Sequence, residues 1–179
     1  MLFEELFKKI VLLKEAADIE NSIENLNDRI AKLRTKDINL NNKSLNKNVC
    51  ILGWAFKKDT NDTRESAAIY VAKNLIKSNI YLNVYDPKVK ESQIFFDMNY
   101  INGNDTCNRE YVSVYNNPLD CIDKTNIIGI LTEGDEFKDY DWEKIYKKMS
   151  KPAYIFDGRN ILDREKLESI GFNYIGLGR

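Results

Sequence analysis

The stretch ILGWAFKKDTNDTRES at residues 51–66 decides the fold class, because it joins an apolar run to a charged turn and an amphipathic segment. The apolar run ends at Gly53 and is typical of a strand buried on both faces in a parallel sheet. From Thr63 onward, small and aliphatic residues recur at helical spacing, and Asp62 with Glu65 three residues later has the form of a capping box. The sequence therefore predicts a strand, a turn and a helix over residues 63–78.

The turn between this strand and helix is a candidate ligand site. Open α/β sheets bind ligands at the carboxyl ends of their strands, where the free N–H groups of a helix start meet anions. The turn carries three basic and three acidic side chains: Lys57, Lys58, Arg64, Asp59, Asp62 and Glu65. The bases suit phosphate oxygens, but the acids cancel their charge, so the turn is no general anion site. A solvated loop before a well-capped helix remains the alternative on these residues alone.

Apolar runs alternate with amphipathic segments along the rest of the chain. The predicted strands cover residues 49–53, 81–85, 111–114, 127–131 and 153–156, with a short last one near Tyr174. The predicted helices after 63–78 cover part of 91–100, a turn or two around 118–122, and residues 142–149 and 164–170. Such alternation predicts an α/β fold with a Rossmann-like, doubly wound, mainly parallel sheet.

A different pattern precedes this alternation. Apolar residues follow a four-three spacing at Leu12, Ala16, Ile19, Ile23, Leu26, Ile30 and Leu33. The spacing predicts a long amphipathic helix within residues 1–36 that pairs with a second copy as a coiled coil, or packs on its own domain. Residues 37–47 are rich in Asn and Lys and are predicted to be a linker, and residues 48–179 form the α/β domain. A homodimer or a higher homo-oligomer is the expected assembly.

Composition narrows the classes of function. The chain has 179 residues, 43% of them hydrophobic, and a formal charge of −1, which predicts one modest core and gives no reason to expect nucleic acid. No apolar run approaches a membrane span, and the opening MLFEELFKK lacks the basic start of a signal peptide, so we expect a cytoplasmic protein. Histidine is absent, which argues against covalent hydrolase chemistry. The three cysteines are too scattered for a zinc site, so no metal site is predicted, and Cys50 and Cys121 are interpreted as inert buried thiols.

Four motifs in order along the chain carry a family resemblance. They are FKKDTNDTRES at 56–66, NVYDPKV at 83–89, TEGDEFK at 132–138 and KIYKKMSKPAYIFDGRNILD at 144–163. Over roughly residues 47–176, the chain resembles the C-terminal UDP-sugar-binding domain of the UDP-glucose 6-dehydrogenases, in particular the animal-type branch. These enzymes oxidise the 6-hydroxyl of a UDP-sugar to a carboxylate in two NAD-dependent steps. The resemblance implies a UDP-sugar ligand, with UDP-glucose suggested by the branch alone.

Carried over onto this sequence, the resemblance implies that Phe56, Lys57 and Arg159 bind the UDP-sugar. The chemistry agrees, because a guanidinium forks onto phosphate or sugar oxygens and a lysine supplies a point charge. For Arg159, an ion pair with Asp157 or Asp163 is the structural alternative. No residue of this chain is predicted to be catalytic.

The cofactor is expected on another domain. The resemblance implies that Arg64 reaches toward NAD held by an N-terminal domain, which in this case is supplied by a longer protein or by a separate dinucleotide-binding chain. Asp86 ends the second predicted strand, where a Rossmann unit carries its ribose-binding acid. However, the first strand leads into the bulky Trp54 and Phe56 rather than a glycine-rich turn, so Asp86 with Pro87 is interpreted as a strand-ending turn. Asp59 and Asp62 are expected to shape their turn as well.

The departures from the family suggest two classes of function. The matched region contains neither the dinucleotide domain nor the family's nucleophilic cysteine, so this chain alone is expected to be inactive. Gly134 stands where the family usually has a tryptophan, which changes the local packing. The first hypothesis is the substrate-binding portion of a UDP-glucose 6-dehydrogenase, as a fragment or as half of a split enzyme. The second is a non-catalytic oligomerisation or nucleotide-sugar-sensing domain.

Overall fold

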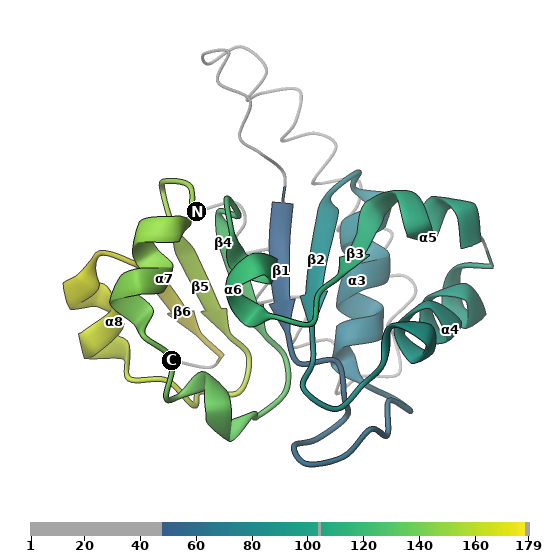
Figure 1. Cartoon of the computed structure of the whole chain (residues 1–179), viewed down its shortest axis with the longest axis horizontal. Helices are drawn as coiled ribbons and strands as arrows, with labels where there is room; N and C mark the ends of the chain where they lie inside the picture. The colour runs from purple at the N-terminus through teal and green to yellow at the C-terminus, as the bar shows by residue number, and fades with distance from the viewer. Residues whose placement is uncertain (1–47, 104, 178–179) are drawn as a thin grey trace, which may run out of the picture. The chain divides into compact units, whose positions relative to one another are not determined.

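A computed structural model describes residues 48–103 and 105–177, and they form a parallel sheet covered by helices (Figure 1). The strands are β1 (Asn48–Leu52), β2 (Tyr81–Tyr85), β3 (Val112–Val114), β4 (Ile127–Ile130), β5 (Tyr154–Asp157) and β6 (Asn173–Gly176). The helices are α3 (Ala67–Lys77), α4 (Glu91–Asn102), α5 (Asp105–Tyr111), α6 (Pro118–Ile122), α7 (Trp142–Lys148) and α8 (Arg164–Ile170), with a 3-10 turn η2 (Asp135–Phe137). The predicted amphipathic helix and linker, 1–36 and 37–47, lie outside the described residues.

The sheet has the strand order β3-β2-β1-β4-β5-β6, and every neighbouring pair is parallel. The predicted doubly wound α/β fold is therefore confirmed. The chain runs outward from β1 to β3 and then returns to start β4 on the other side of β1. The carboxyl ends of β1 and β4 thus meet at the topological switch point, where open α/β sheets place their ligands.

The core lies on both faces of the sheet. On one face, Cys50 and Leu52 of β1 pack in a cluster with side chains from α6, α7 and α8. The alternate β1 residues Val49 and Ile51 point to the opposite face, because side chains alternate along a strand. The buried stripe of α3 belongs to that second face, as expected for a sheet wound on both sides.

Three local predictions need correction. Helix α3 begins at Ala67 rather than Thr63, and its N-cap is Ser66, whose hydroxyl accepts from the Ala68 N–H. The predicted capping box fails because Glu65 has a positive φ of 59°, which no helical residue adopts. The third strand begins at Val112 rather than Tyr111, which is the last residue of helix α5, and no helix was predicted over residues 105–111. Neither η2 nor α5 has the apolar periodicity that indicates a helix.

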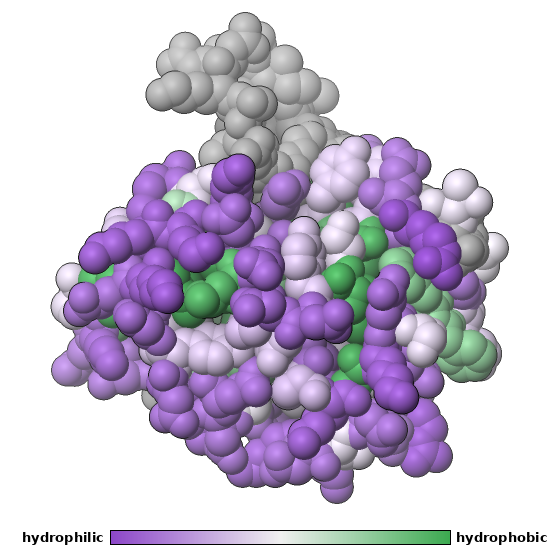
Figure 2. Space-filling model, in the orientation of Figure 1, coloured by the Kyte–Doolittle hydropathy of each residue, from purple (hydrophilic) through white to green (hydrophobic). Residues whose placement is uncertain are grey.

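No helix among residues 48–103 and 105–177 is long and apolar enough to span a membrane. On the face shown in Figure 2, hydrophilic residues predominate and the hydrophobic areas are small and separate.

The predicted buried thiols are confirmed. Cys50 in β1 and Cys121 in α6 are fully buried, with their Sγ atoms 3.0 Å apart. Burial, followed by the hydrogen bond with Cys121, raises the pKa of the Cys50 thiol well above its usual value. Little thiolate, which is the reactive form, is therefore present at neutral pH.

We expect a Cys107→Ser chain to react with a thiol reagent only as fast as the domain opens. The two remaining thiols are buried, so the reagent reaches them only during unfolding. The measurement is the absorbance at pH 8 of the coloured thiolate that a disulfide reagent releases when it reacts with a protein thiol. The same chain in denaturant is the control. A native rate equal to the denatured rate would contradict the burial.

Candidate functional site

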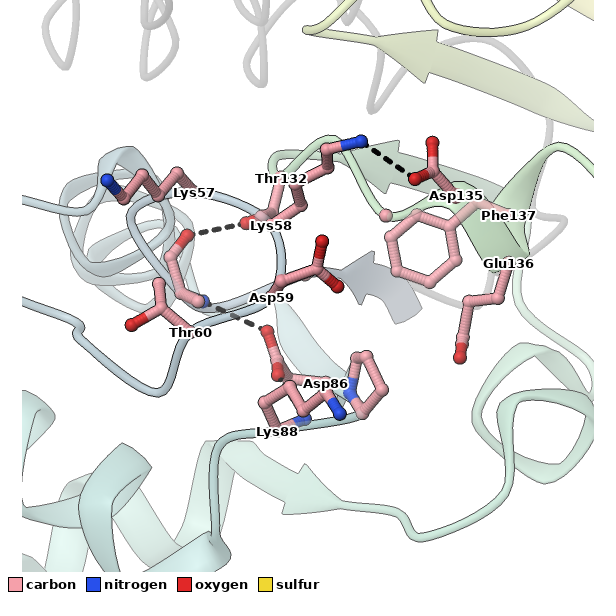
Figure 3. Close-up of a pocket in the computed structure, with 14 residues that line it drawn as sticks. Lys57, Lys58, Asp59, Thr60, Asp86, Lys88, Thr132, Asp135, Glu136 and Phe137 are labelled. Carbon is pink, nitrogen blue, oxygen red and sulfur yellow. Dashed lines mark hydrogen bonds and ion pairs between the residues drawn. The ribbon is translucent and has the colours of Figure 1, made fainter.

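A pocket of about 260 Å³ opens at the carboxyl edge of β2, β1 and β4 (Figure 3). Its walls come from the loops that follow these three strands. The lining residues are Gly53, Ala55, Lys57, Lys58, Asp59, Thr60, Asp86, Pro87, Lys88, Thr132, Gly134, Asp135, Glu136 and Phe137. Three of the four motifs found in the sequence thus meet at one place, although up to about 80 residues separate them along the chain.

The carboxylate of Asp86 fastens the first loop to the end of β2. Its Oδ2 accepts from the backbone N–H groups of Trp54 at 2.6 Å and Ala55 at 2.9 Å. Its Oδ1 accepts from the N–H groups of Lys88 at 2.7 Å and Val89 at 2.9 Å. The predicted strand-ending turn at Asp86 is confirmed. The contact with the first loop was not predicted.

The loop after β1 also lies directly against the loop after β4. Gly53 has a φ of +92°, and a Cβ built on it would lie 2.5 Å from the Cβ of Thr132. The Thr132 hydroxyl donates to the Ala55 carbonyl at 2.6 Å. Glycine is required at this position, because a side chain would clash with Thr132 and would be strained at a positive φ.

Two of the predicted substrate-binding residues are in direct contact. The Arg159 guanidinium, which follows β5, donates through Nε to the Leu131 carbonyl at 2.8 Å and through Nη2 to the Phe56 carbonyl at 3.4 Å. Lys57 is the next residue and lines the pocket with an exposed side chain. The structure therefore brings Phe56, Lys57 and Arg159 together at one edge of the sheet.

The alternative predicted for Arg159 was an ion pair with Asp157 or Asp163. An ion pair is present, but with a different carboxylate. The guanidinium pairs instead with the Glu133 carboxylate, with 3.3 Å between Nε and Oε2. Asp157 is buried and accepts from the Arg159 backbone N–H, so it orients the turn rather than the side chain. The guanidinium is thus held by groups from the loops that follow β4 and β1.

Arg64 occupies the outer end of the same loop. Its guanidinium forks onto the Asp62 carboxylate, with Nε–Oδ1 and Nη2–Oδ2 distances of 2.9 and 2.7 Å. The hydrogen bonds from Arg64 lower the pKa of Asp62 to about 2. The Asp62 carbonyl also accepts from the Phe56 N–H at 2.8 Å and closes the loop, so Asp62 shapes the turn as predicted. The Arg64 side chain is 88% exposed and free to exchange partners.

An ion-pair clasp crosses the mouth of the pocket. Lys58 on the first loop contacts Asp135 of η2 at 2.8 Å, as the dashed line in Figure 3 shows, and Lys138 contacts the other Asp135 oxygen at 2.8 Å. The hydrogen bonds from Lys138 and Lys58 lower the pKa of Asp135 to about 2. Both lysines are half exposed, so the clasp is weak and water screens it.

Glu136 is held on the pocket wall by a pair of tyrosines. The Tyr140 hydroxyl donates to Glu136 Oε1 at 2.6 Å. Burial and, secondly, the hydrogen bond with Glu136 raise the pKa of Tyr85 to about 12, and the same causes raise the pKa of Tyr140. Both tyrosines therefore remain protonated donors at neutral pH. Among residues 48–103 and 105–177, no cluster of three or more acidic, Cys or His side chains forms a metal site.

Sequence reasoning missed several contacts of this site. Thr132 and Lys58 lie in motifs that were recognised, but their partners belong to other loops. Gly134 lies beside the Phe137 ring, and a Cβ built on it would meet the ring at 2.7 Å, so the local packing leaves no room for a side chain there. The Asp-Pro pair at 86–87 indicates a turn, and no local pattern indicates which distant N–H groups its carboxylate accepts from.

The chain is similar to known proteins over most of the described residues. Residues 50–164 match the UDP-binding domain of the UDP-glucose/GDP-mannose dehydrogenase family. The chain belongs to this family. It is 44% identical over 135 residues to the UDP-glucose 6-dehydrogenase of Drosophila melanogaster, which covers 74% of this chain and 28% of that enzyme. It is 43% identical over 142 residues to the UDP-glucose 6-dehydrogenase of Mus musculus, covering 77% and 29%.

Solved structures of dehydrogenases share the fold. A UDP-D-ManNAc dehydrogenase from Pyrococcus horikoshii matches with a TM-score of 0.56 and 26% identity, over 87% of this chain and 31% of that chain. An NDP-N-acetyl-D-galactosaminuronic acid dehydrogenase from Methanosarcina mazei Go1 matches with a TM-score of 0.61 and 23% identity, over 86% and 29%. This UDP-glucose/GDP-mannose dehydrogenase family domain therefore spans less than a third of the length of these relatives.

Proposed function

We propose that this chain is the UDP-sugar-binding portion of an NAD-dependent UDP-glucose 6-dehydrogenase, which converts UDP-glucose to UDP-glucuronate. The meeting of Phe56, Lys57 and Arg159 at the switch point of the sheet, beside a pocket, carries the proposal. The similarity to animal UDP-glucose 6-dehydrogenases supports UDP-glucose as the sugar nucleotide.

Each of the three residues has a role that its surroundings support. Lys57 is exposed at the pocket and offers a point charge to a diphosphate oxygen. Arg159 is already oriented by the two backbone carbonyls and the Glu133 carboxylate, so its remaining N–H groups can donate to a sugar or phosphate oxygen with little entropy to lose. Phe56 is 40% exposed and presents an aromatic face for a ring of the ligand.

We propose that NAD is bound on another domain of a longer protein or on a separate chain. NAD accepts the hydride in each oxidation step. In this chain, a pyrophosphate does not fit the turn after β1, because Asp86 already accepts from its N–H groups. Arg64, whose side chain is exposed, is proposed to contact the cofactor. On this proposal, residues 48–177 bind and orient the substrate, and the chain alone does not reduce NAD. A cytoplasmic homo-oligomer is the proposed context.

Calorimetric titration of the 179-residue chain with UDP, UDP-glucose and UDP-glucuronate tests the proposed function. We expect saturable binding of all three, weaker than in an intact enzyme, because a second domain adds contacts to a ligand held in a cleft. ADP is the matched control, since it carries the same diphosphate on a different base. Equal binding of ADP and UDP would indicate a nonspecific anion site, and no saturable binding of UDP-glucose at millimolar concentrations would overturn the proposal.

A further inference from the structure

The Asp86 carboxylate accepts four backbone hydrogen bonds, an arrangement that can also hold a bound anion. Two N–H groups from Trp54 and Ala55 and two from Lys88 and Val89 converge on one carboxylate, at 2.6 to 2.9 Å. Converging backbone N–H groups at the end of a buried strand are a typical site for a phosphate or a carboxylate. Here the protein supplies the anion itself.

The position of this anion matters for the binding loop. Gly53 donates its N–H to the Tyr85 carbonyl at 2.9 Å. The hydrogen bonding between β1 and β2 therefore continues to Tyr85, the residue before Asp86. Beyond that point, the Asp86 carboxylate links the two loops by accepting from the Trp54 and Ala55 N–H groups. Phe56 and Lys57 come immediately after the two N–H groups that it accepts from.

Other contacts hold the loop from different sides. The indole N–H of Trp54 donates to Asp97 at 2.9 Å, and the Ala55 carbonyl accepts from Thr132. Neither contact satisfies the buried N–H groups of Trp54 and Ala55. Without Asp86 these donors lose their acceptor, and an unpaired buried donor is costly enough to make the loop shift.

We propose that Asp86 is an internal anion that occupies the place of a ligand phosphate and thereby positions Phe56 and Lys57 for the UDP-sugar. The role of Asp86 in ligand binding rests on the proposed function; its role as the anion of this turn does not. Asp86 touches no ligand on this proposal and acts only through the loop.

The first test is chemical rescue of stability. Asp86→Ala is expected to lower the melting temperature by about 10 °C, because four N–H groups lose a charged acceptor. Sodium formate fits the space left by the carboxylate and should raise the melting temperature of Asp86→Ala more than that of the parent. Asp86→Asn fills the same space with an uncharged amide, so it should be destabilised and should gain no more from formate than the parent does.

An exposed acid provides the matched control. Asp139→Ala removes a carboxylate from the surface, so its melting temperature and its response to formate should equal those of the parent. If Asp86→Ala is unfolded at room temperature, formate should restore its folded circular-dichroism spectrum. Equal effects of formate on Asp86→Ala and on Asp139→Ala would overturn the internal anion.

The second test concerns positioning. Well below its melting temperature, folded Asp86→Ala should bind UDP-glucose about tenfold more weakly than the parent, and formate should restore the affinity. The positioning role would be overturned if formate restores the stability of Asp86→Ala while this variant binds UDP-glucose as tightly as the parent, both without and with formate. If the parent itself does not bind UDP-glucose, the proposed function fails, while the stability test still decides whether Asp86 is the anion of this turn.

Discussion

Gly53→Ala is expected to lower the free energy of unfolding by about 2 to 5 kcal/mol. Two costs add: a positive φ, which disfavours a side chain by roughly 1–2 kcal/mol, and a collision with Thr132, for which overpacking costs typically about 1–3 kcal/mol. The Thr132 backbone N would lie 2.8 Å from the new Cβ, so moving the Thr132 side chain does not relieve the contact. This loss is a large part of the stability of a small domain.

Gly103→Ala separates the two costs. Gly103 also has a positive φ, of 66°, but no atom lies within 4 Å of a Cβ built there. It should therefore lose only the conformational cost, about 1–2 kcal/mol. Denaturant unfolding of both variants, followed by circular dichroism, gives the comparison. Equal losses would mean that the loops after β1 and β4 are not in tight contact at Gly53 and Thr132.

The other large effect is expected on ligand affinity. Lys57→Ala and Arg159→Ala should each weaken UDP-glucose binding about ten- to a hundredfold, because each loses charge-assisted contacts of roughly 1.5–3 kcal/mol. Lys57 is the cleaner probe, since its side chain is exposed and its truncation leaves the fold intact. Arg159→Ala also removes hydrogen bonds to two backbone carbonyls, so its binding is to be measured well below its melting temperature.

Arg64→Ala is the matched control for this series. It removes one positive charge from the same loop, but its guanidinium lies at the outer end of the loop and pairs with Asp62 there. It should therefore weaken UDP-glucose binding less than either of the other two variants does. Calorimetric titration measures all three affinities, and thermal melting reports on folding. Equal losses of affinity in the three variants, or losses that follow the loss of stability, would mean that these residues hold the loop rather than the ligand.

The sequence by itself determined the architecture. Apolar runs such as those of β1 and β4 identify buried strands because the strand period and burial are local properties. The bulky Trp54 and Phe56, in place of a glycine-rich turn, were enough to argue against a dinucleotide site, because glycines are what let the backbone approach a pyrophosphate. The four collinear motifs likewise identified the family and placed Phe56, Lys57, Arg64 and Arg159 as candidates.

Only the tertiary structure decided which groups pair across the site. Asp86 lies about 30 residues from the N–H groups of Trp54 and Ala55, and Arg159 lies 103 residues from the Phe56 carbonyl. The order of the strands brings these groups together, and no local pattern encodes it. The same reason explains why the predicted start of α3 at Thr63 is wrong. The loop that contacts Asp86 and Arg159 extends to Glu65, so α3 begins after its N-cap, Ser66. Pairing between distant residues is a property of the assembled sheet, whereas strand and helix are properties of short segments.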